Sequence, residues 1–314
     1  MQDLSGAIAA VSDLIGRSVI GTVVAAFESA FPHRIRSYYL HGSRADHTDI
    51  VTSDVDLDIV VCGSFRDETE QAAINTLAAT LVRDSTTELD LDIIDEESLA
   101  AGANPMLKLG SVLAYGEDIL PRIPMVSIHA WARERMHAAY YLAIVVFHRP
   151  TPVRYPLSLP NETSEFFGYA DRPIVLSDGT GPPGTRDLIR VTGWMASALI
   201  AHHAGQYVPR KQDCHRLYRE HIDDEWSDLI EELYVFCRGE WNYLLPTDQD
   251  QRRRLRDLCR RTLDFENHFL GCYKRFLLEE LANEAANGES RLSWLMRVIP
   301  FEDRDVQTAL RSMQ

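Results

Sequence analysis

Residues 41–61, which read HGSRADHTDIVTSDVDLDIVV, decide the fold. The second half of this stretch, from Asp54 to Val61, alternates acidic and aliphatic residues. Because successive side chains of a β-strand point to opposite faces, this alternation predicts a strand with one polar and one buried face. Gly42 permits a tight turn after a short strand candidate at residues 37–40. The stretch therefore predicts two strands joined through a turn, with acids gathered on one face.

The same alternation recurs downstream. Residues 88–94 predict another acidic strand, and residues 67–83 have the apolar spacing of a helix. Residues 5–31 are largely apolar, but they contain Asp13, Arg17 and Glu28, and their apolar residues recur at helical spacing. An amphipathic helix is therefore favoured there over a membrane span.

The character of the chain changes after residue 125. Helices are expected at about residues 127–147, 186–204, 212–221, 223–238 and 249–283, with Gly205 as a helix C-cap. The run rich in Gly and Pro at residues 177–184 is typical of a linker. We therefore predict an α+β protein of two domains. A mixed-sheet catalytic domain spans residues 1–125, and an α-helical bundle spans residues 126–314.

Charge separates the two halves. The chain carries a net charge of −15, and residues 1–125 hold 8 Lys and Arg against 20 Asp and Glu, a net charge of −12. Nucleic-acid binders need a basic footprint, so no nucleic-acid partner is expected. The same field would attract a cationic substrate or divalent metals. The five cysteines lack metal-type spacing, and no secretory or lipidation signal is visible. A cytoplasmic protein without membrane attachment is expected.

The motif suits nucleotidyl transfer. Asp54 and Asp56 leave the same face of a strand, where their hard oxygen ligands suit two magnesium or manganese ions. Gly42 lets a triphosphate approach the backbone, and Ser43 supplies a hydroxyl donor. A third carboxylate is expected from the neighbouring acidic strand, which offers Asp90 and Asp92 on one face.

These residues resemble the nucleotidyltransferases of the DNA polymerase beta superfamily over about residues 35–120. The similarity includes the closing run Leu109-Gly-Ser-Val-Leu-Ala-Tyr-Gly-Glu-Asp118. The resemblance implies that Asp90 is the third acid, because it aligns without gaps, and ranks Asp92 second. The family leaves the position of Asp58 free.

The C-terminal half is similar to the helical domain of aminoglycoside adenylyltransferases. A helix over residues 190–205 is followed by Tyr207-Val-Pro-Arg-Lys211 and another helix. In such enzymes a basic residue near this turn contacts the triphosphate, which implies Lys211. The stretch 150–185 is longer than the family pattern, so the acceptor stays open. Arg44 has two interpretations: it neutralises phosphate charge beside Ser43, or it pairs with a nearby acid at the surface.

The predicted activity is transfer of AMP from ATP to a hydroxyl of a small, cationic, aminoglycoside-like acceptor, as in antibiotic resistance. Asp54, Asp56 and Asp90 are expected to be both the catalytic acids and the ligands of two Mg²⁺ ions. Gly42, Ser43, Arg44 and Lys211 are expected to bind the nucleotide. Two alternatives remain. One is an antitoxin-type transferase that adenylylates a protein, and the other is a non-catalytic nucleotide-binding module.

Overall fold

The computed structural model describes residues 18–50, 53–174, 181–287 and 300–312. The chain divides into two compact units. The first comprises Met1–Trp131 together with Pro173–Pro182 and Tyr207–Asp213, and the second comprises the remainder. The predicted boundary at residue 125 lies near the end of the first continuous part. The two later segments of the first unit were not anticipated.

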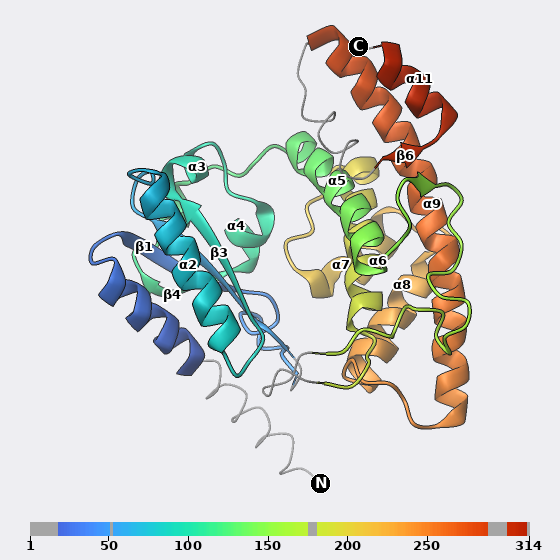
Figure 1. Ribbon diagram of the computed structural model, residues 1–314, viewed down its shortest axis with the longest axis horizontal. Coiled ribbons are helices and arrows are strands. Elements are labelled where there is room, and N and C mark those ends of the chain that lie inside the picture. Colours follow the sequence, from blue (N-terminus) through green and yellow to red (C-terminus); the bar gives the residue numbers. More distant parts are fainter. Residues whose placement is uncertain (1–17, 51–52, 175–180, 288–299, 313–314) are drawn as a thin grey trace. The chain divides into compact units, whose positions relative to one another are not determined.

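The first unit contains a four-stranded mixed sheet (Figure 1). Its order is β3-β2-β1-β4, with β1 antiparallel to β2 and β4, and β2 parallel to β3. The strands are β1 (Ile35–His41), β2 (Val55–Val61), β3 (Leu89–Asp95) and β4 (Val112–Gly116). The first three confirm the predicted strands. The edge strand β4 was not predicted as a strand, and all five of its residues are exposed.

One face of the sheet is covered by two helices. The helix at residues 18–30 and α2 (Glu68–Asp84) lie side by side there (Figure 1). Val23, Phe27 and Ile74 from these helices pack on the aliphatic side chains of β2 that alternate with its acids. Asp67 caps α2 by accepting a hydrogen bond from the Glu70 amide. The predicted helix at residues 5–31 is thus confirmed from residue 18, and its earlier part lies outside the described residues.

The opposite face is apolar at one end. Tyr39 and Val60 pack there with residues of α3 (Glu96–Ala100), α4 (Pro105–Gly110) and the 3-10 turn η1 (Leu120–Arg122). Because Asp56 and Asp58 share this face with Val60, the aliphatic cover leaves the other end of the face to the acids.

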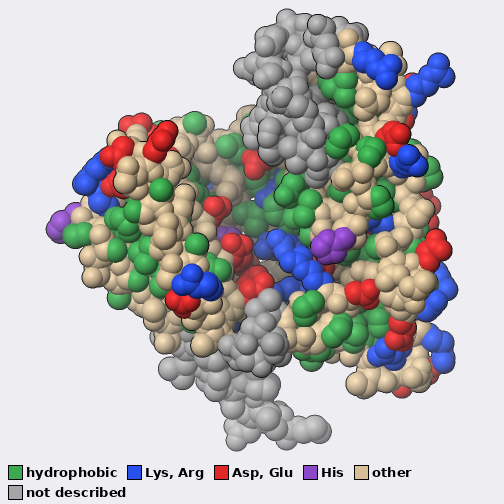
Figure 2. Space-filling view, in the orientation of Figure 1, with side chains coloured by type: hydrophobic (Ala, Val, Ile, Leu, Met, Phe, Trp, Pro, Cys, Tyr) green, Lys and Arg blue, Asp and Glu red, His purple; other side chains and the backbone are tan. Residues whose placement is uncertain are grey.

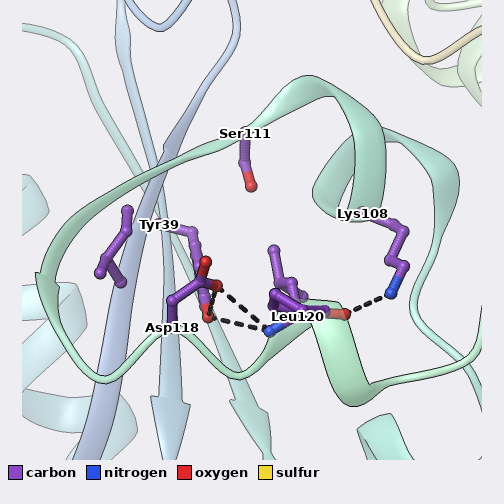
Figure 3. Close-up of a pocket in the computed structure, with 7 residues that line it drawn as sticks. Tyr39, Lys108, Ser111, Asp118 and Leu120 are labelled. Atoms are coloured by element: carbon purple, nitrogen blue, oxygen red, sulfur yellow. Dashed lines mark hydrogen bonds between the residues drawn. The ribbon is translucent and has the colours of Figure 1, made fainter.

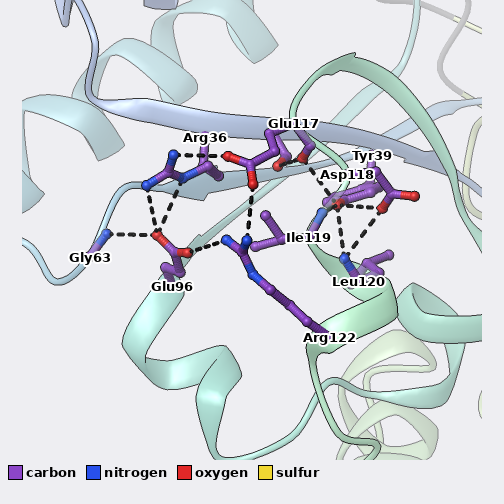
Figure 4. A network of polar contacts seen from close by, with 10 residues as sticks. Arg36, Tyr39, Gly63, Glu96, Glu117, Asp118, Ile119, Leu120 and Arg122 are labelled. Atoms are coloured by element: carbon purple, nitrogen blue, oxygen red, sulfur yellow. Dashed lines mark hydrogen bonds and ion pairs between the residues drawn. The ribbon is translucent and has the colours of Figure 1, made fainter.

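A charged network ties the strands to these helices (Figure 4). Arg36 of β1 pairs with Glu117 at 3.0 Å and with Glu96 at 3.4 Å. Arg122 pairs with the same two carboxylates, each at 3.0 Å. Glu96 also accepts a hydrogen bond from the Gly63 amide, so the end of β2, α3, η1 and the segment after β4 are held to one another.

The second unit is mostly helical. A buried cluster holds its long helix to a loop: Arg149 donates to Tyr169 and Glu266, and Tyr169 also donates to Glu266.

A helix, α5 (Ile128–Val146), begins in the first unit and continues into the second. The other elements are β5 (Val153–Arg154), α6 (Arg186–Leu199), the π-helical turn η2 (Ile200–Ala204), α7 (Cys214–His221), α8 (Ser227–Leu233), the π-helical turn η4 (Tyr234–Glu240), α9 (Gln249–Asn287), β6 (Phe301–Glu302) and α11 (Arg304–Ser312).

The predicted fold class is confirmed: a mixed sheet with helices is followed by a helical region. Gly205 has φ 64° and ends its helix as predicted. Residues 177–180, half of the linker predicted at residues 177–184, lie outside the described residues. No helix within the described ranges is both long enough and apolar enough to cross a membrane.

The pair of Arg34 and Glu70 provides a test of the first unit's stability. Arg34 donates to both Glu70 oxygens, at 2.7 and 2.8 Å, and to the carbonyls of Cys62 and Ser64. The hydrogen bond from Arg34 lowers the pKa of Glu70 from 4.5 to about 2. A carboxylate with a lowered pKa in the folded state stabilises the fold above its unfolded pKa, and this contribution is lost as the pH falls towards the folded value.

Glu70→Gln should therefore reduce the free energy of unfolding by about 1–2 kcal/mol at neutral pH. The difference from the wild type should shrink by more than half at about pH 3, measured by urea unfolding. The control is Asp84→Asn, because the Arg83–Asp84 pair is 61–70% exposed and should contribute little. An equal loss at both pH values would contradict the linkage.

Candidate active site

The turn after β1 contacts a buried acid. Gly42 has φ 73°, a conformation that favours glycine, and a Cβ at this position would overlap a carboxylate oxygen of Asp56. Asp56 is 4% exposed. Glycine is therefore required both by the backbone conformation and by the close approach of the carboxylate. The Gly-Ser turn and the first acidic strand, which the sequence linked only by spacing, touch in the folded chain.

The three predicted acids come together at this end of the sheet. Asp54 directly precedes β2, and Asp56 is the second residue of that strand. Asp90 lies opposite Asp56 in the parallel register of β2 and β3, so both side chains leave the same face. Asp90 is exposed, whereas Asp54 is half-buried.

Burial and neighbouring negative charges disfavour the ionised form of Asp56. Burial raises the pKa of Asp56, and the negative charges of Asp54 and Asp90 raise it further. The cations Lys211 and His41 act in the opposite direction. Positive charge nearby therefore favours the ionised form of this carboxylate.

Asp58 and Asp92 form a second pair of acids along the same strands. They are opposite each other in the β2–β3 register, one step further along than Asp56 and Asp90. The Oδ2 atom of Asp58 lies 3.5 Å from Nε2 of His41. The pKa of Asp92 is raised by desolvation and by the charges of Asp58 and Asp90. Asp58 thus has a protein partner of its own.

His41 was quoted in the motif, but it was given no role by the sequence. Burial opposes its protonation, yet the hydrogen bond and charge of Asp58, with the charge of Asp56, outweigh this effect and raise the pKa of His41. The only signal in the sequence was its position next to Gly42, because its place opposite Asp56 follows from the pairing of β1 with β2.

Arg44 points into the protein and holds the entry to β2. Its guanidinium donates to the carbonyl oxygens of Asp54 at 2.9 Å and Ser53 at 3.1 Å, and lies 3.4 Å from Asp49. The side chain is 8% exposed. These contacts fix the backbone that carries Asp54, while the predicted phosphate contact of Arg44 stays a prediction.

Lys211 lies beside the acids, in the segment Tyr207–Asp213 that belongs to the first unit. Its Nζ atom is 4.0 Å from Oδ1 of Asp56. Three contacts hold the segment: the Tyr207 hydroxyl donates to the Val126 carbonyl at 2.6 Å, Arg210 pairs with Asp46 at 2.9 Å, and the Pro209 carbonyl packs on Gly110 where a Cβ would overlap it.

No group of three or more His, Cys, Asp and Glu side chains is arranged to hold a metal ion within the described ranges of the chain. Among the cationic side chains near Asp56, Lys211 has its Nζ atom 4.0 Å from Oδ1. The donor set itself, three clustered carboxylates of which one is buried, has the chemistry that hard divalent cations prefer.

A pocket of about 200 Å³ lies in the first unit beside β1 (Figure 3). The Tyr39 hydroxyl accepts a hydrogen bond from the Ile119 amide at 2.7 Å and donates to Asp118 at 3.0 Å. Lys108 donates to the carbonyl oxygens of Leu120 and Ile123. These polar groups are engaged in holding η1 and α4, and the residues that line the pocket are distinct from the three acids.

Comparison with known proteins adds likeness to solved structures alone. No protein-family model and no curated protein matches the chain. A solved structure that is similar is the spectinomycin adenyltransferase AAD(9) from Enterococcus faecialis with ATP and spectinomycin. The two are 12% identical, the match covers 77% of this chain and 98% of that chain, and the TM-score is 0.45. At this level the likeness identifies neither the reaction nor the acceptor of this protein.

Proposed function

We propose that this protein transfers AMP from ATP to a hydroxyl group of a small molecule. The observation that carries the proposal is the contact between the Gly42 turn and the buried carboxylate of Asp56, with two further acids and a lysine beside it. A glycine turn next to clustered carboxylates is what transfer between a triphosphate and a hydroxyl requires.

Asp54, Asp56 and Asp90 are the residues that would hold magnesium. When bound, two such ions would neutralise the triphosphate and lower the pKa of the attacking hydroxyl. The raised pKa of Asp56 supports this assignment, because a cation would relieve the repulsion among the three acids.

The chain's own groups would position both substrates. The backbone at Gly42 and the hydroxyl of Ser43 would hold the triphosphate. Lys211, whose side chain is 55% exposed, can turn towards a phosphate without a change in its backbone. Asp90, exposed at the edge of the acid group, would orient the acceptor hydroxyl. Positioning and charge neutralisation supply the rate, so no covalent nucleophile is needed.

The acceptor is proposed to be cationic. Residues 1–125 carry 8 Lys and Arg against 20 Asp and Glu. On the face drawn in Figure 2, most Lys and Arg side chains lie over the helical unit, whereas Asp and Glu side chains gather along one side of the first unit. Two magnesium ions and a triphosphate nearly cancel each other, so an approaching acceptor would still feel the negative protein.

The deciding experiment is incubation with labelled ATP, magnesium and a panel of hydroxylated amines, with AMP-linked products read out by mass. A labelled protein in place of a labelled small molecule would support the adenylylation of a partner. Nucleotide binding without any product would support a non-catalytic module.

The first prediction concerns the buried acid. Asp56→Asn should lower turnover by at least about a thousandfold, because several kcal/mol of charge stabilisation are lost. The fold should survive with an unchanged or higher melting temperature, since burial makes the Asp56 charge unfavourable. Asp84→Asn on α2 provides the same charge change away from the site. Appreciable activity in both Asp54→Asn and Asp56→Asn would contradict the assignment of these acids as magnesium ligands.

The second prediction ranks the third acid. Asp90 faces Asp56 in the strand register, whereas Asp92 faces Asp58. Asp90→Asn should therefore reduce kcat about a hundredfold or more, and Asp92→Asn should reduce it less than about tenfold. Both are measured in single-turnover assays. The reverse order would indicate that Asp92, which faces Asp58, is the third acid instead of Asp90.

The third prediction concerns the acceptor. A cationic acceptor should show a KM that rises with salt, because screening shortens the protein's field to about 8–10 Å near physiological ionic strength. The KM would be measured at low and high potassium chloride, with saturating ATP and magnesium. A neutral acceptor, or a KM that does not change with salt, would refute the cationic class and leave nucleotidyl transfer standing.

A further inference from the structure

Lys211 stands against the carboxylate that the proposed function assigns to magnesium. The distance of 4.0 Å from Nζ to Asp56 Oδ1 joins a side chain that is 55% exposed to one that is 5% exposed. The ammonium group stays largely in water, and a separation of 4.0 Å is at the outer limit of an ion pair. The lysine can therefore neutralise Asp56 without being locked to it.

The backbone of Lys211 is fixed even though its side chain is free to turn. Tyr207, Pro209 and Arg210, all within four residues of it, each contact a different part of the first unit. Lys211 then begins the 3-10 turn η3 (Lys211–Asp213). The ammonium group is thus held within reach of the acids by the segment, and its final position depends on the charges around it.

The charges around Asp56 favour a cation at that point. Asp54 and Asp90 face it with negative charge, and Lys211 and His41 face it with positive charge. A divalent ion placed among the three acids would be attracted by all of them and repelled by the nearby ammonium. The lysine and the ion therefore oppose each other at one carboxylate.

We propose that Lys211 is the counter-ion of Asp56 in the metal-free protein and competes there with the divalent cation. Binding of the ion displaces the ammonium group, which then becomes available to a phosphate of the nucleotide. This inference rests on the proposed function, since it takes its metal site from there. It implies that metal loading and the presentation of Lys211 to the nucleotide are coupled.

The test is direct Mn²⁺ binding in the absence of nucleotide. Free Mn²⁺ would be measured by electron paramagnetic resonance at low salt and about pH 8. Lys211→Met should bind Mn²⁺ about three- to tenfold more tightly than the wild type, because it removes a repelling charge. High salt should reduce this gain. Turnover of the same variant should fall, so affinity and activity move in opposite directions.

The chain offers a matched control among its three lysines. Lys274 pairs with Asp303 and Asp305 in the second unit, so Lys274→Met makes the same charge change away from the acids. It should bind Mn²⁺ as the wild type does. A second readout is thermal: Lys211→Met should melt below the wild type in EDTA, and the gap should close when Mg²⁺ is added.

Equal or weaker Mn²⁺ binding by Lys211→Met would overturn the inference, as would a gain of the same size in Lys274→Met. Failure of the proposed function would look different. The wild type would then transfer no AMP to any acceptor, while Lys211→Met would still bind Mn²⁺ more tightly.

Discussion

A buried carboxylate is the constraint on which the first unit depends. Asp56 lies under the backbone of Gly42, and this contact leaves no room for a side chain at that position. A carboxylate taken out of water must be compensated. The fold supplies Lys211 and His41 on the positive side, while Asp54 and Asp90 add negative charge. The result is a centre with surplus negative charge, held in a rigid sheet.

Much of this centre could be predicted from the sequence, because its determinants are local. Alternation of acids and aliphatics predicted β2 and β3, and the structure confirms both strands. The two-residue period then placed the acids on one face, and the parallel register sets Asp90 beside Asp56. The turn at Gly42 could be predicted for the same reason, because glycine adopts a positive φ more easily than any other residue type.

The remainder depends on contacts between distant parts of the chain, for which the sequence carries no signal. Arg44 turns inward because the carbonyl groups of Ser53 and Asp54, just before β2, accept its hydrogen bonds. These groups meet only when the loop between Arg44 and β2 has folded. The partnership of His41 and Asp58 requires the pairing of β1 with β2. The edge strand β4 was not predicted, because its run of small and apolar residues lacks alternation and packs on β1 from one side only.

Because Tyr207–Asp213 belongs to the first unit, a single cut cannot separate that unit from the rest of the chain. The chain leaves that unit after Trp131 and returns to it between α6 and α7. A fragment that ends at Trp131 would keep Asp54, Asp56, Asp90 and His41 but would lose Lys211. The first unit is therefore discontinuous in sequence, and recombination at a single crossover could not transfer it whole. A swap of everything after Trp131 between related chains would therefore exchange Lys211 together with the helices, although the lysine belongs to the first unit.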